Sequence, residues 1–273
     1  MTSIESQVNA TTADLPVGTR KKPRAPRVQL FGDSHAHAVL RAIEKRKGKG
    51  QPIPLAAHRL LKEKNGVRIG TTSFESFLKL IEDLGSNDLV VSMVGGNQHA
   101  VYSTIQHPQR FDFFTPEAKT AVEPGATIIP YRVVEQIFDV GLRKGDGQLL
   151  QAIRAATAAR VVHILPPPPK GDNEHITQYH ESLFAKDLPE LGVSSPELRL
   201  KFWNLQKGVL LQICAELGIE VVMPPKRAVD EAGFLRPEFY ARDATHGNWL
   251  YGERILREVE RLCRESSPER AAK

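Results

Sequence analysis

The chain has 273 residues, of which 41% are hydrophobic and 25% charged, enough for one well-buried domain and too few for two of independent function. The formal net charge is +5, but no aromatic residues interleave with the basic runs. We therefore interpret these runs as solvated surface and expect no nucleic-acid partner. Met1 to Val17 lack the apolar segment of a signal peptide, and no run of about 18 apolar residues occurs. We expect a cytoplasmic protein without a membrane span; its oligomeric state is not indicated.

The N-terminal half alternates between strand and helix patterns. Residues 1–26 are polar, basic and aperiodic, which predicts a disordered arm before a domain over residues 27–265. The expected elements of this half are a strand over Val28–Phe31, a helix over Ala36–Lys47, a helix over His58–Lys64, a strand over Val67–Ile69, a helix opened by the capping box Thr72-Ser73-Phe74-Glu75, and a buried strand over Leu89–Val94.

The C-terminal half repeats the alternation around two insertions. Residues 100–145 predict an irregular insertion, and residues 166–195, which open with four prolines, predict a second one. Residues 266–273 predict a disordered tail. The expected elements are a helix over Gln148–Ala159, a strand over Val161–Leu165, a helix containing Phe202, Leu205, Val209 and Ile213, a strand over Ile219–Met223, and a helix from Trp249 to about Arg264. Cys214 and Cys263 fall in these helical patterns, which predicts buried thiols rather than a disulfide.

Five short strands alternating with helices predict an α/β fold in which a central parallel sheet carries helices on both faces. Ligands of such sheets bind at the carboxyl ends of the strands. The unusual polar residues and glycines of this sequence follow predicted strand ends: Gly32-Asp33-Ser34, Gly70, Gly96-Asn97, and Asp243 with His246. We therefore expect four separate loops to converge on one edge of the sheet.

Asp243 and His246 are three residues apart, so one loop can hold the imidazole in the tautomer that accepts a proton from a hydroxyl. Ser34 is the hydroxyl that the topology brings to the same edge. The backbone N–H groups of Ser34 and Gly70 and the amide of Asn97 are candidate donors to an oxyanion. Each residue alone has a simpler explanation: Ser34 and Asp243 as helix caps, His246 as a surface residue, and Gly70 and Asn97 as turn residues.

The chain resembles the SGNH (GDSL-like) hydrolases. Phe31-Gly32-Asp33-Ser34-His35 resembles block one, with His in place of the common Leu; Gly70 resembles block two, Gly95-Gly96-Asn97-Gln98 block three, and Asp243-x-x-His246 block five. The resemblance implies a flavodoxin-like three-layer α/β/α sandwich and a serine esterase. It implies Ser34 as nucleophile, His246 as base, Asp243 as its orienting partner, and an oxyanion hole from Ser34, Gly70 and Asn97. Gln98 replaces the usual Asp, and the insertion over residues 100–145 has no counterpart in the family.

Further expectations concern the substrate and the alternative functions. A small-molecule or glycan ester is the expected substrate, and O-acetyl groups on a carbohydrate fit the resemblance, although no motif separates them from other esters. His35, Gln98 and Trp249 are candidate pocket residues, and we expect neither a metal nor a cofactor. Acyl transfer and a glycan-binding module without turnover remain open. So does a metallophosphoesterase-like hydrolase, because Asp33-Ser34-His35 and Gly96-Asn97-Gln98-His99 resemble its ligand segments. That alternative makes His35, His99 and His246 candidate metal ligands.

Overall fold

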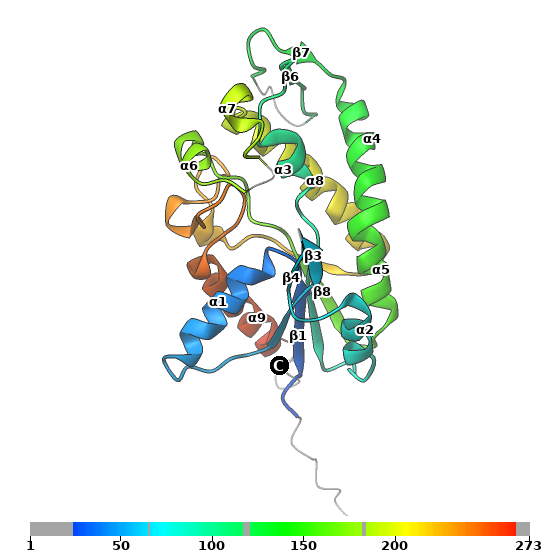
Figure 1. The fold of residues 1–273 in the computed structure, drawn as a ribbon. Coiled ribbons are helices and arrows are strands. Elements are labelled where there is room, and N and C mark those ends of the chain that lie inside the picture. Colours follow the sequence, from blue (N-terminus) through cyan, green and yellow to red (C-terminus); the bar gives the residue numbers. More distant parts are fainter. Residues whose placement is uncertain (1–23, 65, 117–120, 182–183, 266–273) are drawn as a thin grey trace, which may run out of the picture.

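A five-stranded parallel sheet forms the centre of the molecule, which is described here from a computed structural model (Figure 1). The structure describes residues 24–64, 66–116, 121–181 and 184–265. The strand order is β2-β1-β5-β8-β9, with every neighbouring pair parallel. In chain order the strands are β1 (Val28–Gly32), β2 (Ala56–Arg59), β5 (Leu89–Met93), β8 (Arg160–Ile164) and β9 (Glu220–Val222). The second strand lies outside the first, as in flavodoxin-like sheets, so the predicted fold class is confirmed.

Helices cover both faces of this sheet and complete a three-layer sandwich (Figure 1). One face carries α1 (Ala36–Lys47) and α9 (Trp249–Glu265). The other face carries α2 (Phe74–Glu82), α4 (Tyr131–Leu142), α5 (Gln148–Ala155) and α8 (Pro196–Glu216).

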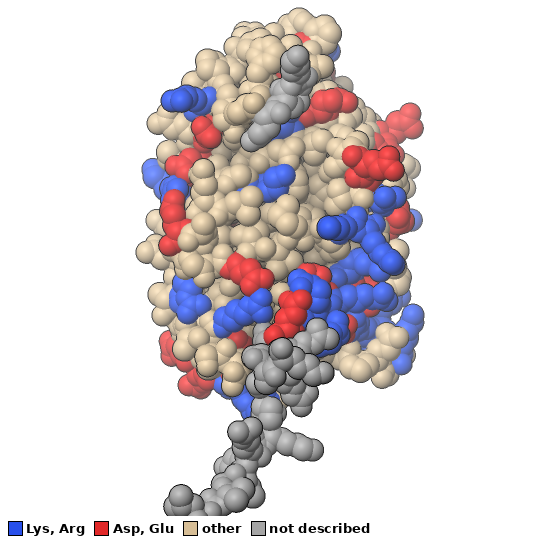
Figure 2. Space-filling view, turned by 180° about the vertical axis from the view of Figure 1, so that it is seen from behind, with Lys and Arg blue, Asp and Glu red and all other residues tan. Residues whose placement is uncertain are grey.

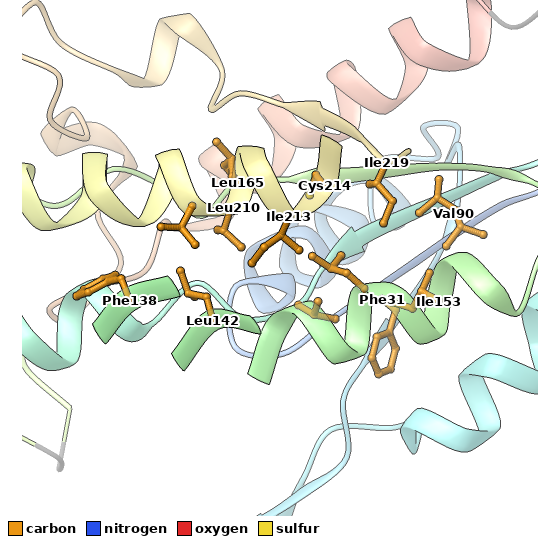
Figure 3. Packing of buried hydrophobic residues seen from close by; sticks show 14 of the residues in the cluster. Phe31, Val90, Phe138, Leu142, Ile153, Leu165, Leu210, Ile213, Cys214 and Ile219 are labelled. Atoms are coloured by element: carbon orange, nitrogen blue, oxygen red, sulfur yellow. The ribbon is translucent and has the colours of Figure 1, made fainter. Parts of the chain in front are cut away.

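The inner strands β1, β5 and β8 consist mainly of apolar residues because both of their faces are buried. Neighbouring residues alternate between the two cores: Leu30 and Val91 pack with α1 and α9, whereas Phe31 and Val90 pack with the opposite helices. Figure 3 shows the second core, in which side chains of α8 such as Ile213 point toward the α4–α5 side. Each such large apolar side chain contributes about 1.5–3 kcal/mol when fully buried.

Smaller elements gather beyond the carboxyl ends of the strands (Figure 1). They are α3 (Gln98–Ser103), α6 (Asn173–Gln178), α7 (Leu188–Leu191), the antiparallel hairpin β3 (Lys62–Lys64) and β4 (Val67–Ile69), and the short parallel pair β6 (Phe111–Asp112) and β7 (Thr127–Ile128). Two 3-10 turns, η2 (Lys226–Ala228) and η3 (Pro237–Phe239), lead from β9 toward α9. These elements surround the edge at which the polar residues were expected.

The predicted helix over residues 58–64 is wrong, and so is the place of the predicted second strand. Residues Ala56–Arg59 form β2, which pairs in parallel with Gln29 to Gly32 of β1. Val67–Ile69 is a strand, but it belongs to the β3–β4 hairpin outside the main sheet. The open edge of β1 imposes an extended conformation on a segment whose local pattern is ambiguous, so tertiary pairing overrides the local preference.

The segment over residues 100–145, expected to be irregular, contains the regular helix α4. Val134, Phe138 and Leu142 are its buried positions, spaced four residues apart. Glycines weaken this helical pattern. Gly141 leaves room for the Gln98 side chain, because a Cβ there would lie 2.6 Å from its Nε2. The helix continues through a π-helical turn, η1 (Arg143–Gly147), into α5.

The other predicted elements are confirmed within two or three residues, apart from the start of α8 and the end of α5. The N-cap of α2 is Ser73, whose side chain accepts from the backbone N–H of Ser76, rather than Thr72. Among the described residues neither cysteine forms a disulfide; Cys214 is buried, whereas Cys263 is only half-buried. The expected disordered segments, residues 1–23 of the arm and 266–273, lie outside the described residues. Across the part that is described, no helix has the length and apolar character needed to cross a membrane.

Candidate active site

Ser34 lies in the turn between the carboxyl end of β1 and the start of α1. Gly32 at the start of this turn lies directly against β5, since a Cβ there would lie 2.7 Å from the carbonyl oxygen of Met93. The N-cap of α1 is His35, and no side-chain hydrogen bond caps this helix. The Ser34 hydroxyl is therefore not used as a helix cap, which removes the simpler explanation for this serine.

Asn97 lies beside Ser34 and contacts two residues of the β1–α1 turn. Its Nδ2 is 3.4 Å from the Ser34 Oγ, and its Oδ1 is 3.0 Å from Nε2 of His35. Because the amide oxygen accepts from His35, the amide nitrogen is the atom presented to Ser34. The loop approaches β1 through Gly95 and Gly96, whose φ angles of +72° and +93° favour glycine.

Two side chains that the sequence did not point to hold this loop. Asp146, in the π-helical turn, accepts from the backbone N–H of Gly96 at 3.1 Å, and its carboxyl group occupies the space where a Cβ on Gly95 would fall. Gln206 of α8 donates to the carbonyl of Gly96 at 3.1 Å and accepts from the backbone N–H of His99 at 2.8 Å. Asp146 and Gln206 thus hold the backbone on both sides of Asn97.

Asp243 and His246 lie on one loop before α9, as predicted. Asp243 Oδ1 accepts from the backbone N–H groups of Thr245 and His246, at 3.0 and 2.8 Å. Its Oδ2 lies 3.0 Å from Nδ1 of His246. The carboxylate thus fixes the ring with Nε2 pointing away from the loop. Nε2 is buried and has no hydrogen-bond partner among the described residues.

The two ends of the domain meet through two imidazole rings. The ring centroids of His35 and His246 are 4.8 Å apart, with an angle of 50° between the ring planes. Since His35 directly follows Ser34, this contact brings the Asp243–His246 loop to the Ser34 turn.

A second carboxylate, Glu181, also faces His246. Glu181 Oε1 lies 3.5 Å from Nδ1 of His246 and accepts from the Thr245 hydroxyl at 2.6 Å. Its Oε2 accepts from the backbone N–H of Ala244 at 3.0 Å. Glu181 comes from the insertion over residues 166–195, where no periodic pattern or motif singles it out.

Lys170 supports the loop from behind. Its side chain is buried, and its Nζ donates to the carbonyls of Asp243 and Ala241 at 2.5 and 2.8 Å. The same nitrogen lies 3.4 Å from Asp243 Oδ1. Burial lowers the pKa of Lys170 to about 8, against the opposing attraction of Asp243. The residue follows the Pro166–Pro169 run, which delivers it to this position.

The carboxylates set the protonation of the two histidines. Burial alone would lower the pKa of His246, but the hydrogen bonds to Asp243 and Glu181 and the charges of both carboxylates raise it to about 9. Burial likewise acts to raise the pKa of Asp243, yet His246 and Lys170 hold it well below its usual range. For His35, burial and then the charge of His246 lower the pKa to about 4. The pair thus combines a strongly basic imidazole with one that stays neutral.

Gly70 lies beside the carboxyl end of β2, the strand next to β1. Its φ is +99°, and a Cβ there would lie 2.1 Å from the carbonyl oxygen of Leu60. Thr71 and Thr72 then run beside Arg59 and Leu60 through hydrogen bonds to the Arg59 carbonyl. Glycine is therefore required by packing, and the role of its N–H in an oxyanion hole stays a prediction.

The three candidate pocket residues, His35, Gln98 and Trp249, lie in different surroundings. His35 lies between Asn97 and His246, whereas the Gln98 side chain lies 3.4 Å from the Ile137 carbonyl of α4. Trp249 lies beside Lys45 of α1, whose Nζ is 5.9 Å from the indole ring centre. A role of Gln98 and Trp249 in binding substrate stays a prediction.

The alternative metal ligands do not gather. His99 Nδ1 lies 3.3 Å from Gln206 Oε1, and His35 Nε2 faces Asn97. Of the described residues, Glu181, Asp243 and His246 alone bring three possible ligand atoms within 4.8 Å of one another. Lys170 already places a positive charge beside that group.

No protein-family model matches the chain, and no curated protein matches it either. Solved structures resemble it in architecture. A phospholipase A1 from Streptomyces albidoflavus aligns over 88% of this chain and 99% of its own, with 11% identity and a TM-score of 0.48. A GDSL-like lipase from Bacteroides thetaiotaomicron aligns over 90% and 92%, with 13% identity and a TM-score of 0.45. A carbohydrate acetylesterase from Sinorhizobium meliloti aligns over 87% and 99%, with 15% identity and a TM-score of 0.43. At this level of similarity, the activity must be judged from the site itself.

Proposed function

We propose that the protein is a serine esterase of the SGNH type, in which Ser34 attacks an acyl ester with His246 as base. One observation carries the proposal: Asn97 contacts Ser34 and His35 together, while the His246 ring, held by Asp243, lies against His35. The arrangement brings a hydroxyl, an imidazole, a carboxylate and an amide donor to one end of the sheet. These are the parts that acyl transfer through an acyl-enzyme requires.

The first half-reaction forms the acyl-enzyme. His246 Nε2 accepts the Ser34 proton as Oγ bonds to the ester carbonyl carbon, and the carbonyl electron pair moves to the oxygen. The Asn97 amide and the backbone N–H groups of Ser34 and Gly70 stabilise this oxyanion; one such donor is worth about 3 kcal/mol. The intermediate then collapses, the bond to the alcohol breaks, and the alcohol leaves with the proton from His246.

The second half-reaction returns the free enzyme. His246 takes a proton from water as the water oxygen attacks the acyl carbon, and the proton returns to Ser34 as the acid leaves. Asp243 keeps Nδ1 protonated and stabilises the imidazolium in both halves. No step needs a metal or a cofactor.

The test is hydrolysis of p-nitrophenyl esters of increasing chain length, with acetylated sugars as further substrates. Preference for the shortest acyl group would favour small O-acyl groups on a carbohydrate. The Ser34→Ala variant should lose the activity and its labelling by a fluorophosphonate probe, with an unchanged thermal unfolding midpoint. An active, folded Ser34→Ala variant would overturn the assignment. A wild-type protein that neither hydrolyses any ester nor takes up the probe would favour a binding module instead.

A further inference from the structure

The last strand of the sheet leaves one edge open. Among the described residues β9 pairs with β8 alone, and it stands at the end of the strand order. The Val222 carbonyl accepts from the backbone N–H of Leu165, so the backbone of Val222 faces β8. Because successive residues of a strand point their N–H and C=O groups to opposite sides, those of Val221 face outward. An extended chain can pair with such an edge.

A hollow of about 580 Å³ lies along this edge, between β9 with the residues after it and one face of α9. We call it the β9 groove. Its lining includes a cluster of cationic side chains: Lys226, Arg227, Arg254, Arg257, Arg261 and Arg264. Four of these lie on α9 at spacings of three and four residues, which places them on one side of the helix. Figure 2 shows Lys and Arg side chains gathered on the right of the molecule in that view.

The acidic side chains that line the β9 groove neutralise only part of its positive charge. Glu258 pairs with Arg261, and Glu220, the other acidic lining residue, pairs with Arg160 outside the lining. Arg257 pairs with Glu253. The remaining cations of the lining, Lys226, Arg227, Arg254 and Arg264, have no ion pair in the described part of the chain. The groove therefore favours an anionic occupant.

The chemistry of the lining selects among anions. None of the described residues that line the groove is aromatic, so the lining offers no platform on which single-stranded nucleic acids stack. Arginine presents a planar fork of donors that matches a carboxylate in two parallel hydrogen bonds. An open strand edge supplies the backbone groups that an extended peptide needs.

We propose that the β9 groove binds an extended acidic segment of a partner protein, which pairs with the edge of β9 and places carboxylates against the arginines. Pro224 and Pro225 come one residue after the three residues of β9, so the backbone pairing is short. The arginines then carry most of the affinity, and binding should weaken as salt rises. The proposal does not depend on the esterase activity.

The experiment uses the full chain and a fluorescein-labelled ten-residue peptide that alternates Glu with Val, followed by fluorescence anisotropy. Arg227→Glu with Arg254→Glu should weaken binding at least tenfold. The matched control is Arg132→Glu, an exposed charge on α4, which should change nothing. The peptide with N-methyl groups on every backbone amide should also bind at least tenfold more weakly, because neither of its edges can donate hydrogen bonds to a strand. Ester hydrolysis should be unchanged in both protein variants.

Three results would overturn the proposal. Absence of binding by the Glu-Val peptide would mean that the arginines only shield the open edge. Equal binding of the N-methylated peptide would mean that the edge takes no part. The third result is that a dodecamer of deoxythymidine, or vesicles containing anionic lipid, bind more tightly than the Glu-Val peptide and that the Arg227/Arg254 variant loses this binding. The groove would then bind a nucleic acid or a membrane surface.

Discussion

The imidazole of His35 and the side-chain amide of Asn97 form a hydrogen bond of 3.0 Å, from Nε2 to Oδ1. The bond decides which end of the amide faces Ser34, because an amide whose oxygen is occupied by His35 must present its nitrogen on the other side. The low pKa of His35, about 4, keeps the ring neutral, with one nitrogen as donor. His35 therefore acts as a positioning residue for a proposed oxyanion donor.

Replacement of His35 tests this role. We expect His35→Leu to lower kcat about two- to tenfold with little change in KM, because a neutral hydrogen bond is worth about 0.5–1.5 kcal/mol. His35→Gln, which keeps a donor, should recover part of the loss. Steady-state hydrolysis of p-nitrophenyl acetate gives kcat and KM for both variants. The control is His107→Ala, which changes an exposed histidine outside the site. Equal rates for the Leu and wild-type proteins would mean that Asn97 is oriented by other contacts.

Asp146 gives a second prediction, which concerns stability as well as rate. Asp146→Ala leaves the Gly96 N–H without its acceptor and should lower the free energy of unfolding by about 1–3 kcal/mol, with a fall in kcat. Asp146→Asn keeps an acceptor oxygen. Burial raises the pKa of Asp146 in the folded state above its value in the unfolded chain. The free energy of unfolding therefore falls as pH rises from the unfolded pKa to the folded one. The Asn variant should therefore match or exceed the wild type in stability at pH 7.

Urea unfolding of the Asp146 variants, with Gln136→Ala as an exposed helical control, supplies the measurement. If Asp146→Asn loses as much free energy of unfolding as Asp146→Ala, the loop requires the negative charge of Asp146 and not only an acceptor for the Gly96 N–H.

Much of the fold could be predicted because the strands carry their own signal. Leu89–Met93 and Arg160–Ile164 are mostly apolar and buried on both faces, and glycines stand where β1 and β5 end. The edge strand β2 carries no such signal, since Ala56–Arg59 is only half-buried and becomes a strand by pairing with β1. The sequence therefore indicates the inner strands and β9 better than the edge strand β2.

The candidate site divides in a similar way. Ser34, Asn97, Asp243 and His246 follow strand ends or share one turn, so short motifs point to them. Asp146 and Glu181 come from a π-helical turn and an irregular insertion, and each acquires a role only when folding brings it to Gly96 or His246. Contacts of this kind depend on tertiary structure and leave no periodic trace in the sequence.

Removal of metal should leave ester hydrolysis unchanged. The proposed nucleophile is a hydroxyl activated by an imidazole, and His35 and His99 are already engaged with Asn97 and Gln206. We expect the same initial rate on p-nitrophenyl acetate before and after prolonged dialysis against EDTA. Loss of activity that returns on adding a divalent metal would instead support the metal-dependent alternative.

The pH dependence of the reaction should report on His246. The base must be unprotonated, and its pKa is raised to about 9, so kcat/KM should rise with pH and level off above about pH 9. Glu181→Gln removes one of the two negative charges that stabilise the imidazolium, which lowers the pKa of His246. The rising limb should then move to lower pH, and the fraction of the plateau rate reached at pH 7 should increase. Glu174→Gln, at an exposed glutamate of α6, should leave the profile where it is. If Glu181→Gln and the wild type give the same limb, the second carboxylate does not set the basicity of His246, and Asp243 alone is responsible.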